Sequence, residues 1–338
     1  MSELFKIKNL KYSNIGVALA VILLLLVALS TSCSKNDSEK NAKQGKADTA
    51  ESTSAEDEED TDDKRLTKNY VYKEIQNGTS LHNGLLLKVD ETHPFTGQIN
   101  NAEMLYSFLF DKEGEQVLAA GYPSDEALPE MLTALNALAC DFQKQSRLNT
   151  LMVSSLVPED EGSKTDEAYI GSCADLMLYD YDEGTFDSFT GEGDYAWIPE
   201  NCYKYGFVMR GADRLRYVGR EAAAYIRYVS TSGGAGDLDS LWDDIREYSF
   251  EKPLYFTAYD DTEYAAYFVP AKEDSTTTSI PIPAGADERE YKHFISGNNY
   301  DGYIVFAYMS ESAPAEEYIT ITDESDPSAE NDQGEDLL

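Results

Sequence analysis

Two polar stretches limit which part of this chain can fold. Residues 34 to 65 read SKNDSEKNAKQGKADTAESTSAEDEEDTDDKR and contain no aromatic or branched aliphatic residue, and the last part of the chain is similarly polar except for the segment YITIT. Such stretches cannot bury enough apolar surface to offset the entropy lost on ordering. We therefore expect a disordered acidic tether at 34–65, an acidic tail at 311–338 in which YITIT has the composition of an edge strand, and a folded region between them.

The N-terminus has the layout of a secretory signal. Three lysines among the first eleven residues precede an apolar run from Ile15 to Leu29, which is followed by Ser-Thr-Ser and Cys33. This order is typical of a signal peptide, and the small residues before the cysteine favour a lipobox at 1–33, with Cys33 becoming the lipidated N-terminus of a lipoprotein. The alternative is an uncleaved anchor, although about 15 apolar residues fall short of the roughly 20 that span a bilayer. Either interpretation predicts an extracytoplasmic, membrane-anchored protein.

The charge and the cysteines exclude several classes of protein. With 63 acidic and 27 basic residues the formal charge is −36, so the surface field repels nucleic acid, and we expect no nucleic-acid partner. If Cys33 is modified, Cys140, Cys173 and Cys202 remain, an odd number without a CxxC spacing. This argues against a disulfide framework and a thiolate zinc site, although one pair could still be bridged. We expect the three to behave as small buried hydrophobes.

The central region contains several predicted elements. The apolar runs GLLLKVD (84–90), LNTLMVSSL (148–156) and SCADLMLYD (172–180) predict strands, and apolar residues at helical spacing predict a helix over 127–146. The segment YAWIPENCYKYGFVMR (195–210) predicts a helix with a proline in its first turn, ended by Gly206, and then a strand. A further helix is expected over 219–234. Aromatic and β-branched runs between turn residues predict a β-rich module, closed by the turn SGNNYDG.

Four of these segments carry a family resemblance. The segment WIPENCYKYGFVMR, followed by LRYVG (215–219) and preceded by LLLKVDETHPF (85–95) and the helix after Ala127, resembles the VanY-type zinc D-alanyl-D-alanine carboxypeptidases, which trim peptidoglycan stem peptides. ISGNNYDGYIV (295–305) is similar to a β-rich extension of some bacterial relatives. The resemblance implies an α+β fold: a carboxypeptidase-like domain at 66–236, with a small antiparallel sheet and helices, followed by the β-rich module at 245–310.

The resemblance also implies where a zinc site would lie. Such an enzyme needs three protein ligands and a glutamate that takes a proton from the metal-bound water. In the family the first two ligands, a His and an Asp, follow a Ser. In the segment DEAYIGSCAD, Asp166 replaces that Ser and Ala168 replaces the His, while Gly171, Cys173 and Asp175 occupy the later places. Asp175 is thus the only surviving candidate ligand.

The other parts of the family's site are also altered. The loop that carries the general-base Glu and the third ligand is about a dozen residues shorter here, because the chain passes from Arg210 through GAD to Arg214. Ser154 begins SSLV, which matches a Ser-Gly-Tyr-Arg segment whose Arg grips the substrate carboxylate. We therefore expect a vestigial cleft without an intact catalytic residue and without a cofactor. Its residues are Ser154, Asp166, Ala168, Gly171, Asp175, Arg210 and Arg214.

Several interpretations of the smaller features stay open. Arg210 and Arg214 could hold a carboxylate such as a peptide C-terminus, or Arg214 could form a salt bridge with Asp175 or Asp213. The acidic clusters suit solvated charge better than calcium, because YDYDEGTFD (179–187) lacks the spacing of an EF-hand loop. The histidines are expected to be surface or hydrogen-bonding residues rather than ligands. They are His82, His93 and His293.

These observations favour one function and leave two others. The sequence favours a cell-envelope pseudoenzyme whose cleft binds a peptidoglycan stem peptide or an envelope protein without cleaving it. The second candidate is an active zinc D,D- or L,D-carboxypeptidase with ligands that the sequence does not identify. The third is a surface-display stalk without a ligand.

Overall fold

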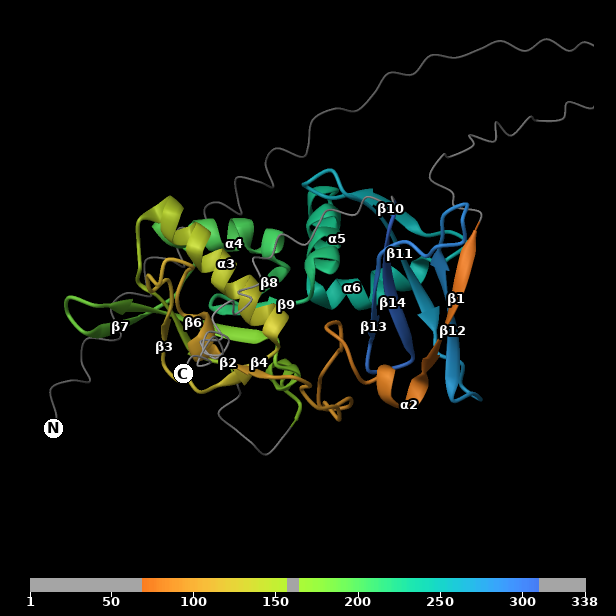
Figure 1. Cartoon of the computed structure of the whole chain (residues 1–338), viewed down its shortest axis with the longest axis horizontal. Coiled ribbons are helices and arrows are strands. Elements are labelled where there is room, and N and C mark those ends of the chain that lie inside the picture. The colour runs from red at the N-terminus through yellow and green to blue at the C-terminus, as the bar shows by residue number, and fades with distance from the viewer. Residues whose placement is uncertain (1–68, 157–163, 310–338) are drawn as a thin grey trace, which may run out of the picture. The chain divides into compact units, whose positions relative to one another are not determined.

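A six-stranded sheet forms the framework of residues 119–217 (Figure 1). The computed structural model describes residues 69–156 and 164–309. The strands of this sheet run in the order β3–β5–β6–β9–β8, with β7 also paired to β6, and only the β3–β5 pair is parallel. Their bounds are Ala119–Ala120 (β3), Leu151–Ser155 (β5), Cys173–Asp180 (β6), Thr185–Ser188 (β7), Phe207–Arg210 (β8) and Arg214–Tyr217 (β9). The strands predicted over 148–156, 172–180 and at FVMR are confirmed.

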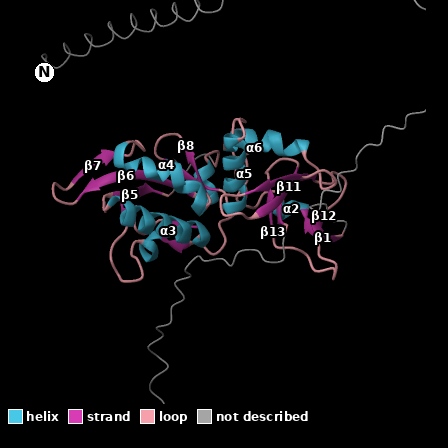
Figure 2. Ribbon diagram, turned by 90° about the horizontal axis from the view of Figure 1, so that it is seen from above, coloured by secondary structure: helices cyan, strands magenta, loops and turns pink. Residues whose placement is uncertain are grey.

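Helix α3 (Pro129–Ser146) covers one face of this sheet and runs alongside β5 and β6 (Figure 2). It begins with proline at its first position, which needs no amide donor there. Apolar side chains at helical spacing, among them Leu135, Leu138 and Phe142, are buried against Val153 and Leu176 of the strands. The predicted helix over 127–146 is confirmed.

The segment before β8 also folds as predicted. The short helices η3 (Gly193–Ala196), α4 (Trp197–Asn201) and η4 (Cys202–Tyr205) follow one another, and Gly206 ends the last of them with φ 84°. A Cβ atom at Gly206 would lie 2.8 Å from Cε2 of Tyr217, so the close approach of β9 requires glycine as well as the left-handed backbone.

The C-terminal part contains a second, four-stranded antiparallel sheet in the order β10–β11–β14–β13. Its strands are Leu254–Thr257, Glu263–Pro270, Gly302–Tyr308 and His293–Gly297 in that order. Along β14, Ile304 and Phe306 pack with α5 (Arg220–Thr231) and α6 (Leu238–Asp244), while Tyr303 and Val305 pack with β12 (Thr277–Pro283). Burial on both faces explains why this strand is apolar throughout. The predicted β-rich module and the α+β fold class are confirmed.

The first described strand joins this C-terminal part. β1 (Tyr70–Gln76) pairs antiparallel with β12 over its whole length. The chain then forms α2 (Asn77–Ser80), η1 (Leu105–Phe108), the small sheet of β2 (Glu103–Met104) and β4 (Glu126–Ala127), and later η2 (Glu167–Ile170) and η5 (Ile245–Glu247). The domain boundaries proposed above stay a prediction.

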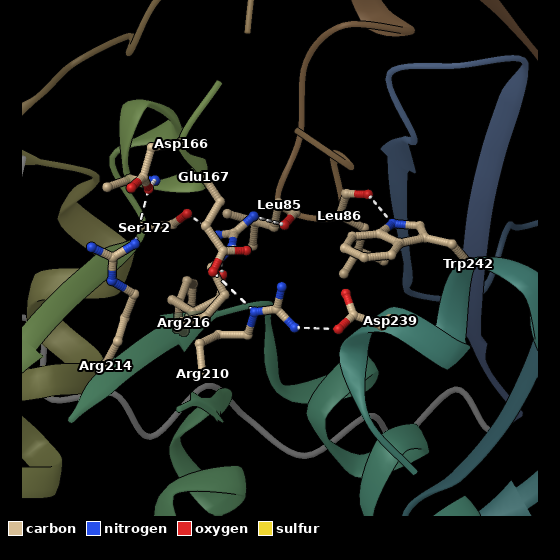
Figure 3. Close-up of polar contacts among 12 residues, drawn as sticks. Leu85, Leu86, Asp166, Glu167, Ser172, Arg210, Arg214, Arg216, Asp239 and Trp242 are labelled. Atoms are coloured by element: carbon tan, nitrogen blue, oxygen red, sulfur yellow. Dashed lines mark hydrogen bonds and ion pairs between the residues drawn. The ribbon is translucent and has the colours of Figure 1, made fainter. Parts of the chain in front are cut away.

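One predicted strand is wrong. Residues 84–90, GLLLKVD, form no strand, although Leu86 and Leu87 are buried. Side chains supply several of this segment's backbone partners in place of a ladder: the carbonyl of Leu85 accepts from Arg216 and that of Leu86 from Trp242 (Figure 3). The amide of Leu86 donates to Ser296, and the amide of Lys88 donates to the carbonyl of Asn298. A short apolar run indicates burial, but by itself does not establish strand pairing.

The described residues contain three cysteines, none of which forms a disulfide. Cys140, Cys173 and Cys202 are all free, and the last two are buried while Cys140 is half-buried. Between residues 69 and 309, leaving aside 157–163, we find no helix with the length and apolar character needed to span a bilayer. The predicted signal peptide, Cys33, the tether and YITIT lie outside the described residues.

Candidate functional site

The register of three strands brings the candidate site residues together. Asp175 of β6 lies directly opposite Arg214 of β9, and Arg214 lies opposite Arg210 of β8. β8 and β9 are joined by residues 211–213 only, so the chain reverses tightly at the place where the sequence analysis expected a shortened loop. This cross-strand row is the centre of the candidate site.

Arg214 and Asp175 form a bidentate ion pair. The Nε of Arg214 donates to Oδ1 of Asp175 at 2.6 Å and its Nη2 donates to Oδ2 at 3.0 Å. Its third nitrogen, Nη1, donates to Oδ1 of Asp166 at 2.9 Å. The hydrogen bonds to Asp175 raise the pKa of Arg214 above its ordinary value, against the effect of burial. The two alternatives for Arg214 were binding of a ligand carboxylate and a salt bridge within the chain, and in the structure Arg214 forms the salt bridge with Asp175.

Arg210 belongs to a second group of charges (Figure 3). Its Nε donates to Oε1 of Glu167 at 3.0 Å and its Nη1 to Oδ2 of Asp239 at 2.9 Å. Burial lowers the pKa of Arg210, but the hydrogen bond to Asp239 and the charge and hydrogen bond of Glu167 outweigh it, so that the pKa is raised. Glu167 begins η2, and Asp239 lies in the first turn of α6.

Arg216 is the most buried charge of the site, with an exposed fraction of 0%. Its guanidinium donates to the carbonyls of Tyr217 and Leu85, at 2.8 and 2.7 Å, and to the hydroxyl of Ser172 (Figure 3). Its Nε makes no hydrogen bond and lies 3.6 Å from Oε2 of Glu167. Glu167 therefore bridges Arg210 and Arg216.

Glu167, Arg216 and Asp239 were not predicted as site residues from the sequence. One signal was present for Arg216, because residues two apart on a strand point to the same face, as Arg214 and Arg216 do. Nothing local indicated Asp239, which reaches the site from a helix 29 residues after Arg210.

The remaining predicted residues support the site from its edge. Ser154 on β5 donates from Oγ to the carbonyl of Asp175 at 3.1 Å. Asp166 caps η2 by accepting from the amide of Ala168 at 2.8 Å, and Ala168 itself is buried. Gly171 ends η2 with φ 77°, and a Cβ there would lie 2.7 Å from Cδ1 of Ile99. These four positions have structural roles around the row of charges.

The three histidines are held elsewhere. His82 bonds Asn299 through Nδ1 at 2.8 Å, His93 stacks on Tyr300, and His293 contacts Lys73 through Nε2 at 3.0 Å. Each is engaged with neighbours from other segments.

A shallow pocket of about 540 Å³ opens over the row. Ser154, Asp175, Arg210 and Arg214 line it together with Glu167 and Met177. A second hollow of about 520 Å³ lies between α3, η4 and α5 and includes Cys140 and Lys204, but none of the predicted site residues. We take the first as the candidate site, because it contains the positions singled out by the sequence.

These residues do not fit zinc. Both oxygens of Asp175 accept from Arg214, so a zinc ion bound there would lie beside a guanidinium, whose positive charge opposes binding of the cation. Cys173 is buried and does not line the pocket, and burial raises the pKa of its thiol to about 12. Within 69–156 and 164–309 there is no group of three His, Cys, Asp or Glu side chains placed to hold a metal ion.

Comparison with known proteins gives two informative likenesses. No family model matches the chain. A D-alanyl-D-alanine carboxypeptidase of Enterococcus faecium is 28% identical over 116 residues, which are 33% of this chain and 36% of that protein, so the match spans about a third of the relative's length. The vancomycin-resistance D,D-dipeptidase VanXYg, solved with a phosphinate analogue of D-Ala-D-Ala, has a TM-score of 0.55 at 20% identity, covering 71% of this chain and 99% of that chain.

A third likeness is weaker. The LdcB LD-carboxypeptidase, solved to explain peptidoglycan recognition, has a TM-score of 0.34 at 14% identity and covers 46% of this chain and 84% of that one. The resemblance found in the sequence is confirmed by the match to the carboxypeptidase and by the fold shared with VanXYg.

Proposed function

We propose that this chain, which has the fold of the VanY-type carboxypeptidases, is an exported cell-envelope protein whose cleft binds a peptidoglycan stem peptide or an envelope protein without cleaving it. The observation that carries the proposal is the ion pair of Asp175 and Arg214. In this pair the candidate metal ligand Asp175 is bound by the guanidinium of Arg214, which is permanently charged. The pocket above this ion pair is open, so a ligand can still bind there although the site lacks the groups that zinc-dependent hydrolysis needs.

The relatives support the class of ligand. VanXYg was solved with an analogue of D-Ala-D-Ala, and the matched Enterococcus protein is a D-alanyl-D-alanine carboxypeptidase. A stem peptide ending in D-alanine is therefore the first ligand to test. We expect weak binding, at roughly millimolar to high micromolar Kd, because both arginines of the pocket already hold carboxylates and a ligand must compete with them.

Turnover and binding together test the proposal. The full chain, supplied with zinc, should release no D-alanine from a stem pentapeptide, whereas a zinc-loaded D,D-carboxypeptidase used as positive control should. The same pentapeptide should shift backbone amide resonances near Asp175. Release of D-alanine together with one tightly held zinc per chain would favour the active enzyme, and the absence of both turnover and binding would favour a display stalk.

Chelation gives an independent prediction. EDTA should change the melting temperature by less than about one degree, because the charges in the cleft hold one another without a metal. A structural zinc ion would add several kcal/mol of folding free energy that depends on its occupancy. A clear drop in melting temperature on chelation, restored by added zinc, would contradict the proposal.

The anchoring proposal concerns Cys33. In bacteria that process lipoproteins, Cys33→Ala should abolish incorporation of a labelled fatty acid, because the modified thiol is removed. Ser32→Ala, which keeps the cysteine and a small residue before it, serves as the matched control and should still be labelled. An intact N-terminus found by mass spectrometry would instead favour the uncleaved anchor.

A further inference from the structure

The hairpin of β6 and β7 carries an exposed aromatic cluster that the proposed function does not use. Tyr179 and Phe186 are cross-strand partners with ring centroids 5.2 Å apart, and Tyr181 packs edge-on against Tyr179 at 4.7 Å. Phe186 is 59% exposed and Tyr181 is 44% exposed. Large apolar side chains that cluster at the surface mark sites of interaction more often than lone ones do.

This cluster extends the open face of the sheet beyond the cleft. Leu176 and Leu178 of β6 pack with the buried apolar residues of α3. The alternate residues Asp175, Met177 and Tyr179 therefore face the other side of the sheet. Met177 lines the pocket and lies between Asp175 and Tyr179 on the same face of β6. Among the described strands, β7 pairs with β6 alone, so its outer backbone edge is unpaired (Figure 1).

The charges around the cluster are of one sign. No Lys, Arg or His occurs between Lys164 and Lys204, and the turn that joins β6 to β7 carries Asp182 and Glu183 directly after Tyr181. Asp187 lies opposite Leu178 and so faces the α3 side, while Asp180 accepts from the amides of the turn. Carboxylates beside exposed aromatic faces suit a cation, since a lysine or arginine can stack on a ring and pair with a carboxylate at the same time. The same field repels anionic polymers.

We propose that the β6–β7 hairpin is a docking surface for a basic, extended polypeptide segment of a partner protein. Lysine or arginine side chains of the segment lie over Phe186 and Tyr181, its charges pair with the hairpin carboxylates, and its backbone pairs with the free edge of β7. The inference goes beyond the proposed function, because it concerns a surface beside the cleft and holds whether or not the cleft binds a stem peptide.

The test uses variants that leave the net charge of the chain unchanged. A fluorescent peptide of four Lys-Thr repeats should bind the full chain, and Phe186→Ser and Tyr181→Ser should each weaken binding by about fivefold or more in anisotropy titrations. Tyr72→Ser is the matched control, because Tyr72 is 61% exposed on β1. It should bind the peptide as the native chain does, and all three variants should keep the native melting temperature.

Three outcomes would overturn the proposal. Undirected attraction to an acidic protein predicts equal binding by Phe186→Ser and the native chain. Loss of binding in Tyr72→Ser to the same extent would place the contact elsewhere. Equal binding of a Glu-Thr repeat peptide would remove the role of charge. A stem-peptide titration reports separately on amides near Asp175, so failure of this surface is distinguishable from failure of the cleft.

Discussion

Replacement of Arg216 by alanine should lower the free energy of unfolding by about 3 to 5 kcal/mol, the cost typical of breaking a buried charge network by removing one partner. The side chain is fully buried, and its loss would leave the carbonyls of Leu85 and Tyr217 and the hydroxyl of Ser172 without their donor. It would also leave Glu167 with Arg210 as its one remaining cation in the described network.

The measurement is urea-induced unfolding followed by circular dichroism. Arg216→Met fills much of the space without supplying donors, and it should also be strongly destabilised, because the buried acceptors stay unpaired. Arg289→Ala is the control, since the Arg289 side chain is 82% exposed, and we expect a change within about 0.5 kcal/mol. Native stability of Arg216→Met would show that volume, and not hydrogen bonding, is what this position supplies.

The sequence predicted the elements whose signals are local. α3 was recognisable from apolar residues at helical spacing, and Gly206 from its place after a short helix, because both signals depend on neighbours within a few residues. The GLLLKVD run had an equally strong apolar signal and was misjudged. Its backbone partners include Arg216, Trp242 and Ser296, which are all more than a hundred residues away, so no local pattern predicts them.

The candidate site was predictable in part for the same reason. The shortened connection between β8 and β9 was visible in the sequence, and a three-residue reversal places Arg210 opposite Arg214. The pairing of Asp175 with Arg214 follows from the β6–β9 register, which the resemblance implied only through the order of the segments. The contacts of Glu167 and Asp239 depend on where η2 and α6 pack against the sheet, and tertiary packing sets that position.

Arg214→Ala should lower the free energy of unfolding by about 1 to 3 kcal/mol. The substitution removes the cation that Asp175 and Asp166 share, so the two carboxylates lose their hydrogen bonds and repel each other. The loss is smaller than for Arg216, since the Arg214 side chain is 23% exposed and water can enter. Arg214→Lys keeps the charge but not the forked donors, so it should recover only part of the loss.

A double-mutant cycle of Arg214→Ala with Asp175→Ala decides whether this pair is structural or is available to a ligand. If the guanidinium and the carboxylate hold each other, the two substitutions should be non-additive in urea unfolding, with a coupling energy of about 1 to 2 kcal/mol. Asp213→Ala is the control, because Asp213 lines the same pocket but the bidentate contacts of Arg214 go to Asp175. Additive losses, combined with weaker stem-peptide binding by Arg214→Ala at native stability, would instead make Arg214 a carboxylate-binding residue, with the ion pair formed only in the absence of ligand.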